Sequence, residues 1–484
     1  MKNLLILPRL RPTNKMNYDY TFPLGICYIA SVIKKNGFHL DCINLNHLNG
    51  SVEEILEKEL KKGYDNVLSG NIFVGYLVLK EIVSAVRKFS SKSKIIIGGS
   101  VISSDPSIIE NLKPDFGIIG EGEMTIINLL KTGQNKPEEI KDLDELPYPD
   151  FESFGFDEYL NNLYTNQDYF TTIEDYPRIY PIIGSRGCPF NCTFCYHHGK
   201  YRERSIDSII DELKYAIKKY KINIVVLFDD LFSINKKRLI EFCDKIKQFN
   251  IKWSCQVSIQ YLDEEILKHL KESGCFVISY GFESYDENVL KSMKKPITSK
   301  QIDFAIKKSM ENKINIQGNF IFGDLAETKE TANRTLDYWE KNCKGQLNLA
   351  FIQPYPGSFI YNECLKKGLI KDKLTYISQI CGGEIYLNMT HNMTNEEYID
   401  LVNKIKELRN SSYYYSKINE IERIKKNYKI KVSCPFCNKV ITYENFDPFK
   451  SPCLICRECF MRFYAISDIK EVNEANWKAW RENG

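Results

Sequence analysis

The stretch YPIIGSRGCPFNCTFC, residues 180–195, joins a short apolar run to a loop with three cysteines, Cys188, Cys192 and Cys195. A closed zinc site, or an iron–sulfur cluster that only transfers electrons, normally takes four protein ligands. Three thiolates leave one corner of a metal centre open, and an open corner is a place where a substrate can bind. The spacing therefore indicates a metal centre that takes part in chemistry.

Short apolar runs alternate with helical patterns, such as 205–220 and 235–249, on the C-terminal side of this loop. The predicted strands, starting with the one before the loop, lie at 180–187, 223–230, 251–258, 276–284, 315–323 and 346–356. Six strands of one direction predict a full or partial (β/α) barrel, whose active site lies at the C-terminal face. The three-cysteine loop follows the first strand, so we expect it to open onto the mouth of the barrel.

The N-terminal part has the same alternation, which predicts a parallel, doubly wound sheet of the Rossmann type. Its predicted strands lie at 3–8, 39–45, 67–73, 94–100 and 116–123. Such sheets bind ligands at the carboxyl ends of their strands. The candidate cofactor-binding residues at these ends are Ser69, Gly70, Gly98, Gly99, Ser100, Gly120 and Glu121. Glycine lets a bulky ligand approach the backbone, although each glycine also fits an ordinary strand-to-helix turn.

Two close pairs of cysteines lie near the C-terminus, Cys434-x2-Cys437 and Cys456-x2-Cys459, with 18 residues between the pairs. This spacing matches the two knuckles of a zinc ribbon. Cys453 is a fifth thiol that could replace one of the four. An auxiliary iron–sulfur cluster is the alternative to zinc, because both metals accept four thiolates.

The predicted fold class is α/β, with five parts along the chain. They are a Rossmann-like domain at 1–133, a linker at 134–178, the barrel at 179–375, a helical segment at 376–429 and the ribbon at 430–470. The linker is polar, contains proline and has no clear period. Within the helical segment, residues 392–428 have a helical pattern.

Charge and composition exclude several classes of partner. Lys and Arg number 66 against 63 Asp and Glu, a net charge of +3, so no global field attracts nucleic acid or an acidic membrane. The first residues, MKNLLILPRL, are too short an apolar run for a signal peptide, and no stretch approaches the roughly 20 apolar residues of a membrane helix. We therefore expect a cytoplasmic protein, in which 16 cysteines serve metal sites and buried packing more than disulfides.

The loop CPFNCTFC, residues 188–195, resembles the C-x3-C-x2-C motif of the radical S-adenosylmethionine (SAM) enzymes. The resemblance covers roughly residues 1–405 and is closest to the branch with an N-terminal cobalamin-binding domain, which is class B methyltransferase-like. Further motifs stand in the order of that branch: FPLGICYIASVIKKNG (22–37), IIIGGS (95–100), GIIGEGEMT (117–125), YRERS (201–205), FDDLF (228–232), GFES (281–284), GNFIFGDLAET (318–328) and PYPGS (354–358).

The resemblance implies that Cys188, Cys192 and Cys195 hold a [4Fe-4S] cluster whose fourth iron binds SAM. Four implied contacts of SAM are Phe194 beside the third cysteine, Gly281 and Glu283 at a strand end, and the segment that contains Gly318, Gly323 and Glu327. Two simpler interpretations stay open at this stage. Glu327 could cap the next helix through its dipole, and Asp229-Asp230 could be a solvated loop.

Some positions depart from the pattern of the family. No Asp-x-His-x-x-Gly motif is present, and His47 has only half of it, so we expect cobalt to lack a histidine ligand from this chain. Ser258 and Gln260 stand where the branch often has Arg and Asp. His197 and His198 follow the cysteine loop and are candidates to face substrate, although exposed loop histidines are the commoner case.

The resemblance implies an enzyme that cleaves SAM to a 5′-deoxyadenosyl radical and, with cobalamin, methylates an unactivated carbon. Its partners would be an unidentified substrate and an external low-potential electron donor of the flavodoxin or ferredoxin type. The same machinery used for cyclisation or rearrangement, without methyl transfer, is a second hypothesis. A non-catalytic, metal-bearing adaptor that binds a partner through the ribbon is a third.

Overall fold

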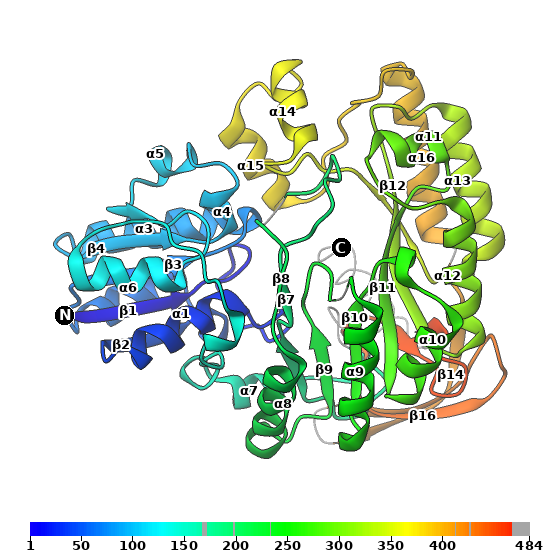
Figure 1. Ribbon diagram of the computed structural model, residues 1–484, viewed down its shortest axis with the longest axis horizontal. Coiled ribbons are helices and arrows are strands. Elements are labelled where there is room, and N and C mark those ends of the chain that lie inside the picture. Colours follow the sequence, from blue (N-terminus) through cyan, green and yellow to red (C-terminus); the bar gives the residue numbers. More distant parts are fainter. Residues whose placement is uncertain (167–171, 197–198, 233, 412, 425–426, 467–484) are drawn as a thin grey trace.

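The computed structural model describes residues 1–166, 172–196, 199–232, 234–411, 413–424 and 427–466 (Figure 1). His197 and His198 therefore lie outside the described residues. The described strands form three main sheets and one two-stranded sheet. No helix within the described ranges is long and apolar enough to cross a membrane.

The first sheet is parallel and has the order β2-β1-β3-β4-β5. Its strands are β1 (Lys2–Leu7), β2 (His39–Asn44), β3 (Asn66–Gly70), β4 (Lys94–Gly98) and β5 (Phe116–Gly117). The helices between them are α1 (Leu24–Lys35), α2 (Val52–Leu60), α3 (Tyr76–Phe89), α4 (Ser100–Ser103), α5 (Ile108–Leu112) and α6 (Glu123–Thr132), with the short turns η1 (Leu45–His47) and η2 (Phe73–Gly75).

Strand β1 shows why this region forms a doubly wound sheet. Leu5 and Leu7 belong to the core cluster on the side of α1 and α6, whereas Leu4 and Ile6 belong to the cluster on the side of α2 and α3. A strand buried on both faces reads as a continuous apolar run, which is the pattern of a parallel sheet covered by helices. The predicted Rossmann-like fold is confirmed.

The second sheet contains the six predicted barrel strands, all parallel, in the order β13-β12-β11-β10-β9-β6. They are β6 (Ile179–Ile182), β9 (Ile224–Leu227), β10 (Lys252–Gln256), β11 (Cys275–Glu283), β12 (Asn315–Phe322) and β13 (Asn348–Phe351). Strands β6 and β13 form the two edges, so the barrel is partial. The helices of this unit are α8 (Ile206–Tyr220), α9 (Lys236–Ile246), α10 (Glu264–Glu272), α11 (Glu287–Ser292), α12 (Ser299–Glu311) and α13 (Lys329–Asn342), with the turns η5 (Lys247–Phe249) and η6 (Ile259–Tyr261).

The segment predicted as a polar linker has an aromatic core. It contains η3 (Leu143–Glu145), η4 (Glu152–Phe154) and α7 (Phe156–Leu160). The ring of Phe151 lies 5.4 Å from Phe22 of the N-terminal unit and 5.2 Å from Tyr180 of β6, both edge to face. One continuous apolar cluster therefore runs from the first sheet through this segment into the barrel.

The chain after the barrel differs from the predicted helical segment. It contains α14 (Phe359–Lys366), α15 (Lys373–Gly382) and α16 (Asn395–Ser411), but β14 (Tyr415–Ile424) is a strand. β14 pairs with β15 on one side and β18 on the other, and these tertiary hydrogen bonds override the helical propensity of its charged residues. The prediction of a helix over 392–428 is therefore wrong beyond residue 411.

The third sheet has the order β16-β15-β14-β18-β17, with β15 (Asn427–Ser433), β16 (Val440–Phe446), β17 (Cys453–Ile455) and β18 (Arg462–Ile466). We call residues 415–466 the C-terminal ribbon. It binds the amino ends of two barrel strands: the Asn315 side chain donates to the Phe460 carbonyl at 2.9 Å, and Gln346 donates to the Arg462 carbonyl at 2.9 Å. Figure 1 shows β14 and β16 below the barrel strands and α14 and α15 at the opposite end.

Candidate active site

The cysteine loop starts and ends on a two-stranded base. Strand β7 (Ser185–Arg186) pairs antiparallel with β8 (Arg202–Glu203), and this pair forms the base of the cysteine loop at the carboxyl end of β6. Gly187 has φ +77°, and a Cβ there would lie 2.6 Å from the Lys200 carbonyl oxygen. The loop thus stands at the end of the first barrel strand, where the sequence predicts it.

Hydrogen bonds hold the middle of this loop against two neighbouring elements. The Thr193 amide donates to the Met293 carbonyl after α11 at 3.0 Å, and the Ile360 amide of α14 donates to the Thr193 carbonyl at 3.0 Å. Phe194 packs, partly buried, on the apolar cluster that α11 and α14 share. The structure therefore gives Phe194 a packing role beneath the loop.

The thiols of the loop are close enough to affect one another electrostatically. Burial raises the pKa of Cys192, and the nearby Glu283 carboxylate and Cys188 thiol add to the rise against the opposing effect of Lys295. Burial also raises the pKa of Cys188. Without a metal these thiols favour the protonated form, so a bound metal would have to displace their protons.

Glu283 lies at the end of β11 beside a cation that the sequence did not single out. The carboxylate is 3.0 Å from Lys295 Nζ, and the side chains are 11% and 18% exposed. Glu283 has φ +62° and follows an irregularity in the pairing of β11 with β12. The Cβ position of Gly281 lies 2.4 Å from Lys295 Nζ, so the ends of the two paired side chains pass directly over this glycine.

Lys295 faces the cysteine loop as well as Glu283. Burial lowers its pKa, but the carboxylate of Glu283 and the thiol of Cys192 raise it by more. Lys294-Lys295-Pro296 is an ordinary-looking turn in the sequence, and Lys295 lies 12 residues from its partner. No local pattern could have selected this lysine among the many in the chain.

The glycines of the GNFIFGDLAET segment have structural explanations. A Cβ on Gly318 would lie 2.4 Å from the Tyr280 carbonyl oxygen, so the close approach of β11 requires glycine there. Gly323 has φ +99°, and a Cβ there would lie 3.0 Å from the Tyr398 hydroxyl of α16. These contacts exist without any ligand, so they do not by themselves indicate that SAM lies on this backbone.

Glu327 is buried and accepts a hydrogen bond from the Gly323 amide at 2.6 Å. It does not cap the next helix, because α13 begins at Lys329 and the Thr328 side chain caps it by accepting from the Thr331 amide. The side-chain cap of α13 is therefore Thr328, and Glu327 stands two residues before the helix begins. Burial raises the pKa of Glu327 to about 8, and the neighbouring carboxylate of Asp324 adds to the rise.

Asp229 is buried as well, so the solvated-loop interpretation is wrong for this residue. Its carboxylate accepts hydrogen bonds from the Ser185 amide and from the Ser185 hydroxyl, the latter at 2.7 Å. Burial raises the pKa of Asp229 to about 7. Because Ser185 begins β7, Asp229 supports the base of the cysteine loop.

Several predicted residues at the N-terminal strand ends are engaged inside the fold. The Ser69 hydroxyl donates to the Ile6 carbonyl at 3.0 Å, and a Cβ on Gly70 would lie 2.8 Å from the Gly98 carbonyl oxygen. Gly99 has φ +92°, with the Asn71 carbonyl oxygen 2.4 Å from the Cβ position. Ser100 begins α4. Close packing within the sheet accounts for the small residues at these positions.

Two of the predicted glycines face open space. A Cβ on Gly98 meets only Ile118, at 3.7 Å, and a Cβ on Gly120 meets nothing within 4 Å. Exposed apolar side chains lie at the same carboxyl edge, with Ile72 47% and Ile119 38% exposed. This edge can therefore receive a ligand with a large apolar face.

Glu121 has charged partners on the cysteine loop. Its carboxylate lies 2.9 Å from Arg186 and 2.7 Å from Arg202. Burial raises the pKa of Glu121, but these two guanidinium groups lower it by more, so the carboxylate is held ionised. The prediction that it contacts a cofactor has no support in these contacts.

His47 is enclosed by protein groups. Its Nε2 atom lies 2.9 Å from the Tyr20 hydroxyl, and Nδ1 lies 3.7 Å from the Glu158 carboxylate. Burial lowers the pKa of His47. Both ring nitrogens thus face other side chains, in keeping with the expectation that this residue is not a cobalt ligand.

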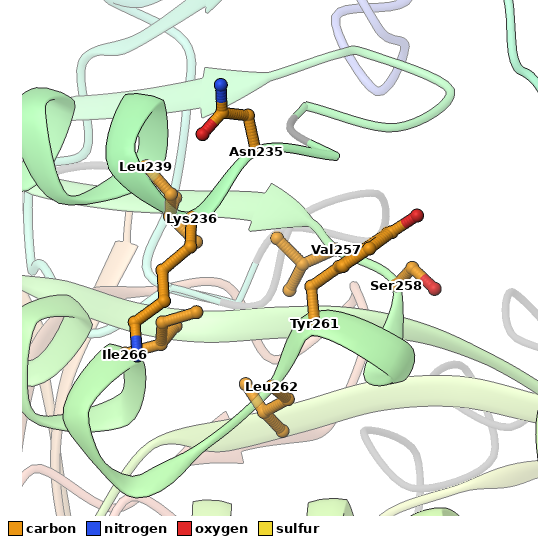
Figure 2. A pocket seen from close by; sticks show the side chains of 8 residues that line it. All are labelled: Asn235, Lys236, Leu239, Val257, Ser258, Tyr261, Leu262 and Ile266. Carbon is orange, nitrogen blue, oxygen red and sulfur yellow. The ribbon is translucent and has the colours of Figure 1, made fainter.

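A recess beside the barrel mouth contains Ser258 (Figure 2). Figure 2 shows that its side chains come from the start of α9, from the segment between β10 and α10, and from Ile266 of α10. The cavity volume is about 10 Å³, room for no more than one water molecule. It is too small for a substrate and contains none of the residues predicted to bind a cofactor.

The ribbon brings the four predicted C-terminal cysteines together. Cys434 Sγ lies 3.7 Å from Cys459 Sγ, Cys437 Sγ lies 3.7 Å from Cys456 Sγ, and all four atoms lie within 4.8 Å of one another. Ligands about 2.3 Å from one tetrahedral ion stand about 3.8 Å apart. Backbone amides of Phe436 and Glu458 point at the sulfurs from 3.4 Å, which favours thiolates.

Among the described residues, this is the one group of such ligand atoms that is so compact. The three thiols of the cysteine loop do not belong to this compact group. Cys453 belongs to β17 and not to the compact group. The predicted set of four is the set that the structure assembles.

Comparison with known sequences gives a consistent family. The model of the radical SAM superfamily matches residues 182–338. An uncharacterized methyltransferase of Pyrococcus horikoshii is 26% identical over 410 residues, which cover 76% of this chain and 84% of the relative. An anaerobic magnesium-protoporphyrin IX monomethyl ester cyclase of Cereibacter sphaeroides is 24% identical over 376 residues, which cover 70% of this chain and 60% of the relative.

Solved structures share the fold. The radical SAM methyltransferase TsrM from Kitasatospora setae, with cobalamin and a [4Fe-4S] cluster bound, has a TM-score of 0.61 at 15% identity over 76% of this chain and 75% of its own. The cobalamin-dependent SAM radical enzyme OxsB has a TM-score of 0.56 at 18% identity over 86% of this chain and 62% of its own. The superfamily match over residues 182–338, the methyltransferase relatives and the shared fold agree with one another, and the chain is similar to radical SAM enzymes of the class B, methyltransferase-like kind.

Proposed function

We propose that the chain is a cobalamin-dependent radical SAM methyltransferase that methylates an unactivated carbon of a substrate still to be identified. The observation that carries the proposal is the position of the three-cysteine loop. It lies at the carboxyl end of barrel strand β6, and its base contacts α6 of the Rossmann-like unit at that unit's own ligand-binding edge. This position supports a centre that acts between the barrel mouth and a ligand at the carboxyl edge of the first sheet.

The donor set fits a [4Fe-4S] cluster at Cys188, Cys192 and Cys195. The three thiols lie on one loop and affect one another electrostatically, and they range from buried Cys192 to exposed Cys195. Lys295 brings positive charge to this site, which offsets the negative charge of thiolates. When bound, the cluster would supply the electron that cleaves SAM, and an external flavodoxin or ferredoxin would supply the electron to the cluster.

We assign SAM to the mouth beside the cluster. Glu283 pairs with Lys295, and its carboxyl oxygens can accept hydrogen bonds from the hydroxyls or the amine of SAM. Gly318 allows the close approach of the β11 backbone, while Gly281 lies beside Lys295 and Gly323 beside the Tyr398 hydroxyl. Glu327 holds the turn after β12 through the Gly323 amide, so its role in the proposal is to shape the wall of the site.

We assign cobalamin to residues 1–133, at the carboxyl edge of the first sheet. Gly98 and Gly120 leave open space there, and Ile72 and Ile119 present apolar surface to it. The solved structures of TsrM and OxsB contain bound cobalamin, which supports the same ligand for this chain. Cobalamin would supply the methyl group, and the barrel at 179–375 would supply the radical.

We assign zinc to the ribbon, within residues 430–470. The 3.7 Å sulfur separations match one tetrahedral ion, whereas a four-iron cluster would need a larger cage. The ribbon binds the amino ends of the barrel strands, at the end opposite the cysteine loop. This position favours a structural role over electron delivery to the active site.

Cyclisation without methyl transfer is the second candidate function, because one relative is named as a ring-forming cyclase. The non-catalytic adaptor is the weakest candidate, since the cysteine loop and its supporting residues are intact. The test is mass spectrometry of products formed anaerobically from candidate substrates with SAM, reductant and cobalamin. A gain of about 14 mass units with loss of a substrate hydrogen supports methylation, unchanged or reduced mass supports cyclisation, and no SAM cleavage supports the adaptor.

A further inference from the structure

Four charged side chains join the base of the cysteine loop to the Rossmann-like unit. Arg186 lies 2.9 Å from Glu121 and 2.6 Å from Glu123, while Arg202 lies 2.7 Å from Glu121. The side chains are between 6% and 18% exposed. We call Glu121, Glu123, Arg186 and Arg202 the interdomain ion-pair cluster.

The position of this cluster follows from the pairing of two short strands. Arg186 and Arg202 are direct partners in the β7–β8 pair, so both guanidinium groups leave the same place in the base of the loop. Arg186 is two residues before Cys188 in the chain. Glu123 is the first residue of α6 and Glu121 lies two residues before it. Both ends of the loop therefore contact the same end of this helix.

Further contacts fix the orientation of each charged group. The Arg186 guanidinium lies 5.5 Å from the ring centre of Tyr28 in α1. Arg202 also donates to the Ile140 carbonyl, and the Ile140 amide donates to Glu121 at 2.8 Å. Arginine and carboxylate pairs with two hydrogen bonds are directional, so they set relative orientation as well as distance.

A second path leads from the cysteine loop to the same unit by way of Gly357, which lies next to both. Gly357 has φ +86°, and a Cβ there would lie 2.5 Å from the ring of Tyr196 and 2.9 Å from the Ser104 carbonyl oxygen. Tyr196 directly follows Cys195, and Ser104 ends α4 of the first unit. Base and tip of the cysteine loop are thus both held near the carboxyl edge of the first sheet.

We propose that Glu121, Glu123, Arg186 and Arg202 are positioning residues that set the separation between a centre on the cysteine loop and a ligand at the first sheet. Ion pairs this buried gain little net stability, because desolvation offsets their attraction. Their directional geometry is what distinguishes them from the aromatic packing that already joins the two units. The inference rests on the proposed function, because it concerns transfer between a radical site and a bound corrinoid.

The test compares wild type with Glu123→Gln, Arg186→Met and the double variant, each loaded with cluster and cobalamin. Glu53→Gln is the matched control, because Glu53 forms an exposed pair with Lys88 at 2.6 Å in the same unit. Two quantities are measured: the ratio of 5′-deoxyadenosine to methylated product, and the distance distribution between the reduced cluster and cob(II)alamin by dipolar electron paramagnetic resonance.

We expect the single variants to raise the ratio at least tenfold and to broaden the distance distribution, and the double variant to equal the worse single. The control should match wild type in both. Wild-type ratios and distances in folded, loaded variants would overturn the inference. If wild type binds no corrinoid, the proposed function fails. The positioning role is then tested by amide hydrogen exchange of residues 187–196. Exchange as slow in the variants as in wild type would overturn that role.

Discussion

The C-terminal ribbon gives the most quantitative prediction, which concerns the loss of one thiol. Cys437→Ser removes one of four sulfurs that all lie within 4.8 Å of one another. The matched control is Cys453→Ser, which changes a buried thiol of the same ribbon outside that group. If the compact group binds one metal ion, the two variants should differ sharply.

The expected magnitude follows from the ligand count. Structural zinc contributes about 10–16 kcal/mol to the folding of small domains, or roughly 3 kcal/mol for each of four ligands. At about 1.4 kcal/mol per tenfold change, Cys437→Ser should weaken zinc binding roughly 100-fold. Cys453→Ser should change the affinity less than about threefold.

Metal removal should also reach the barrel. Hydrogen bonds of Asn315 and Gln346 join the ribbon to the barrel, and three of these bonds measure 2.9, 2.9 and 2.7 Å. At about 1 kcal/mol each, their loss should lower the free energy of unfolding of the barrel by about 3 kcal/mol. For a unit of this size that corresponds to roughly 6–12 °C in Tm.

The assay combines metal analysis after dialysis against a chelator, hydrogen exchange of residues 427–466 and thermal unfolding. We expect one zinc per chain in wild type and Cys453→Ser, and none in Cys437→Ser. In Cys437→Ser the amide hydrogens of the ribbon should exchange fast. Its barrel should unfold separately from the ribbon and at a lower temperature. About four irons bound at the ribbon, or metal retention in Cys437→Ser, would refute the reasoning.

Three further predictions concern single positions. Gly98→Leu should lower cobalamin loading at least tenfold without loss of folding, since a Cβ there meets only Ile118. The control Gly25→Leu, at an exposed glycine, should load cobalamin like wild type. Equal loading of the two variants would place the corrinoid elsewhere. Glu327 has a pKa of about 8 when folded and about 4.5 when unfolded, so it binds protons more tightly when folded, and stability should fall by roughly 4 kcal/mol as the pH rises from 4.5 to 8. Glu327→Gln should flatten that slope in urea titrations, and an unchanged slope would assign it to other groups. Lys295→Met leaves Glu283 unpaired and should cost about 3 kcal/mol in urea unfolding, most of it recovered when Glu283→Gln is added; no recovery would show that the pair itself is not the cause.

The sequence predicts the features that depend on local spacing. Cys188, Cys192 and Cys195 are close along the chain, so the loop that carries them brings them together whatever surrounds it. The six barrel strands are apolar runs because parallel strands are covered on both faces, and that pattern is visible without coordinates. The four ribbon cysteines are readable for the same reason, since each pair forms one tight turn.

Features that depend on distant partners could not be predicted. Glu121 lies at a ligand-binding edge by its sequence position, but its partner Arg186 is 65 residues away, and no local signal connects them. The helical pattern that ends at residue 428 fails because β14 obtains its hydrogen bonds from two other strands. Phe151 in the polar linker becomes core only because Phe22 and Tyr180 meet it in the folded chain.

The measurement that tests the central claim most directly is the formation of 5′-deoxyadenosine by anaerobically reconstituted, reduced protein supplied with SAM. We predict about four irons at the cysteine loop and repeated cleavage of SAM by wild type. The variant with Cys188, Cys192 and Cys195 all replaced by alanine should form none, while the control Cys243→Ala, a buried thiol of α9, should match wild type. Undiminished cleavage by the triple variant would contradict the assignment of this loop as the radical-forming centre.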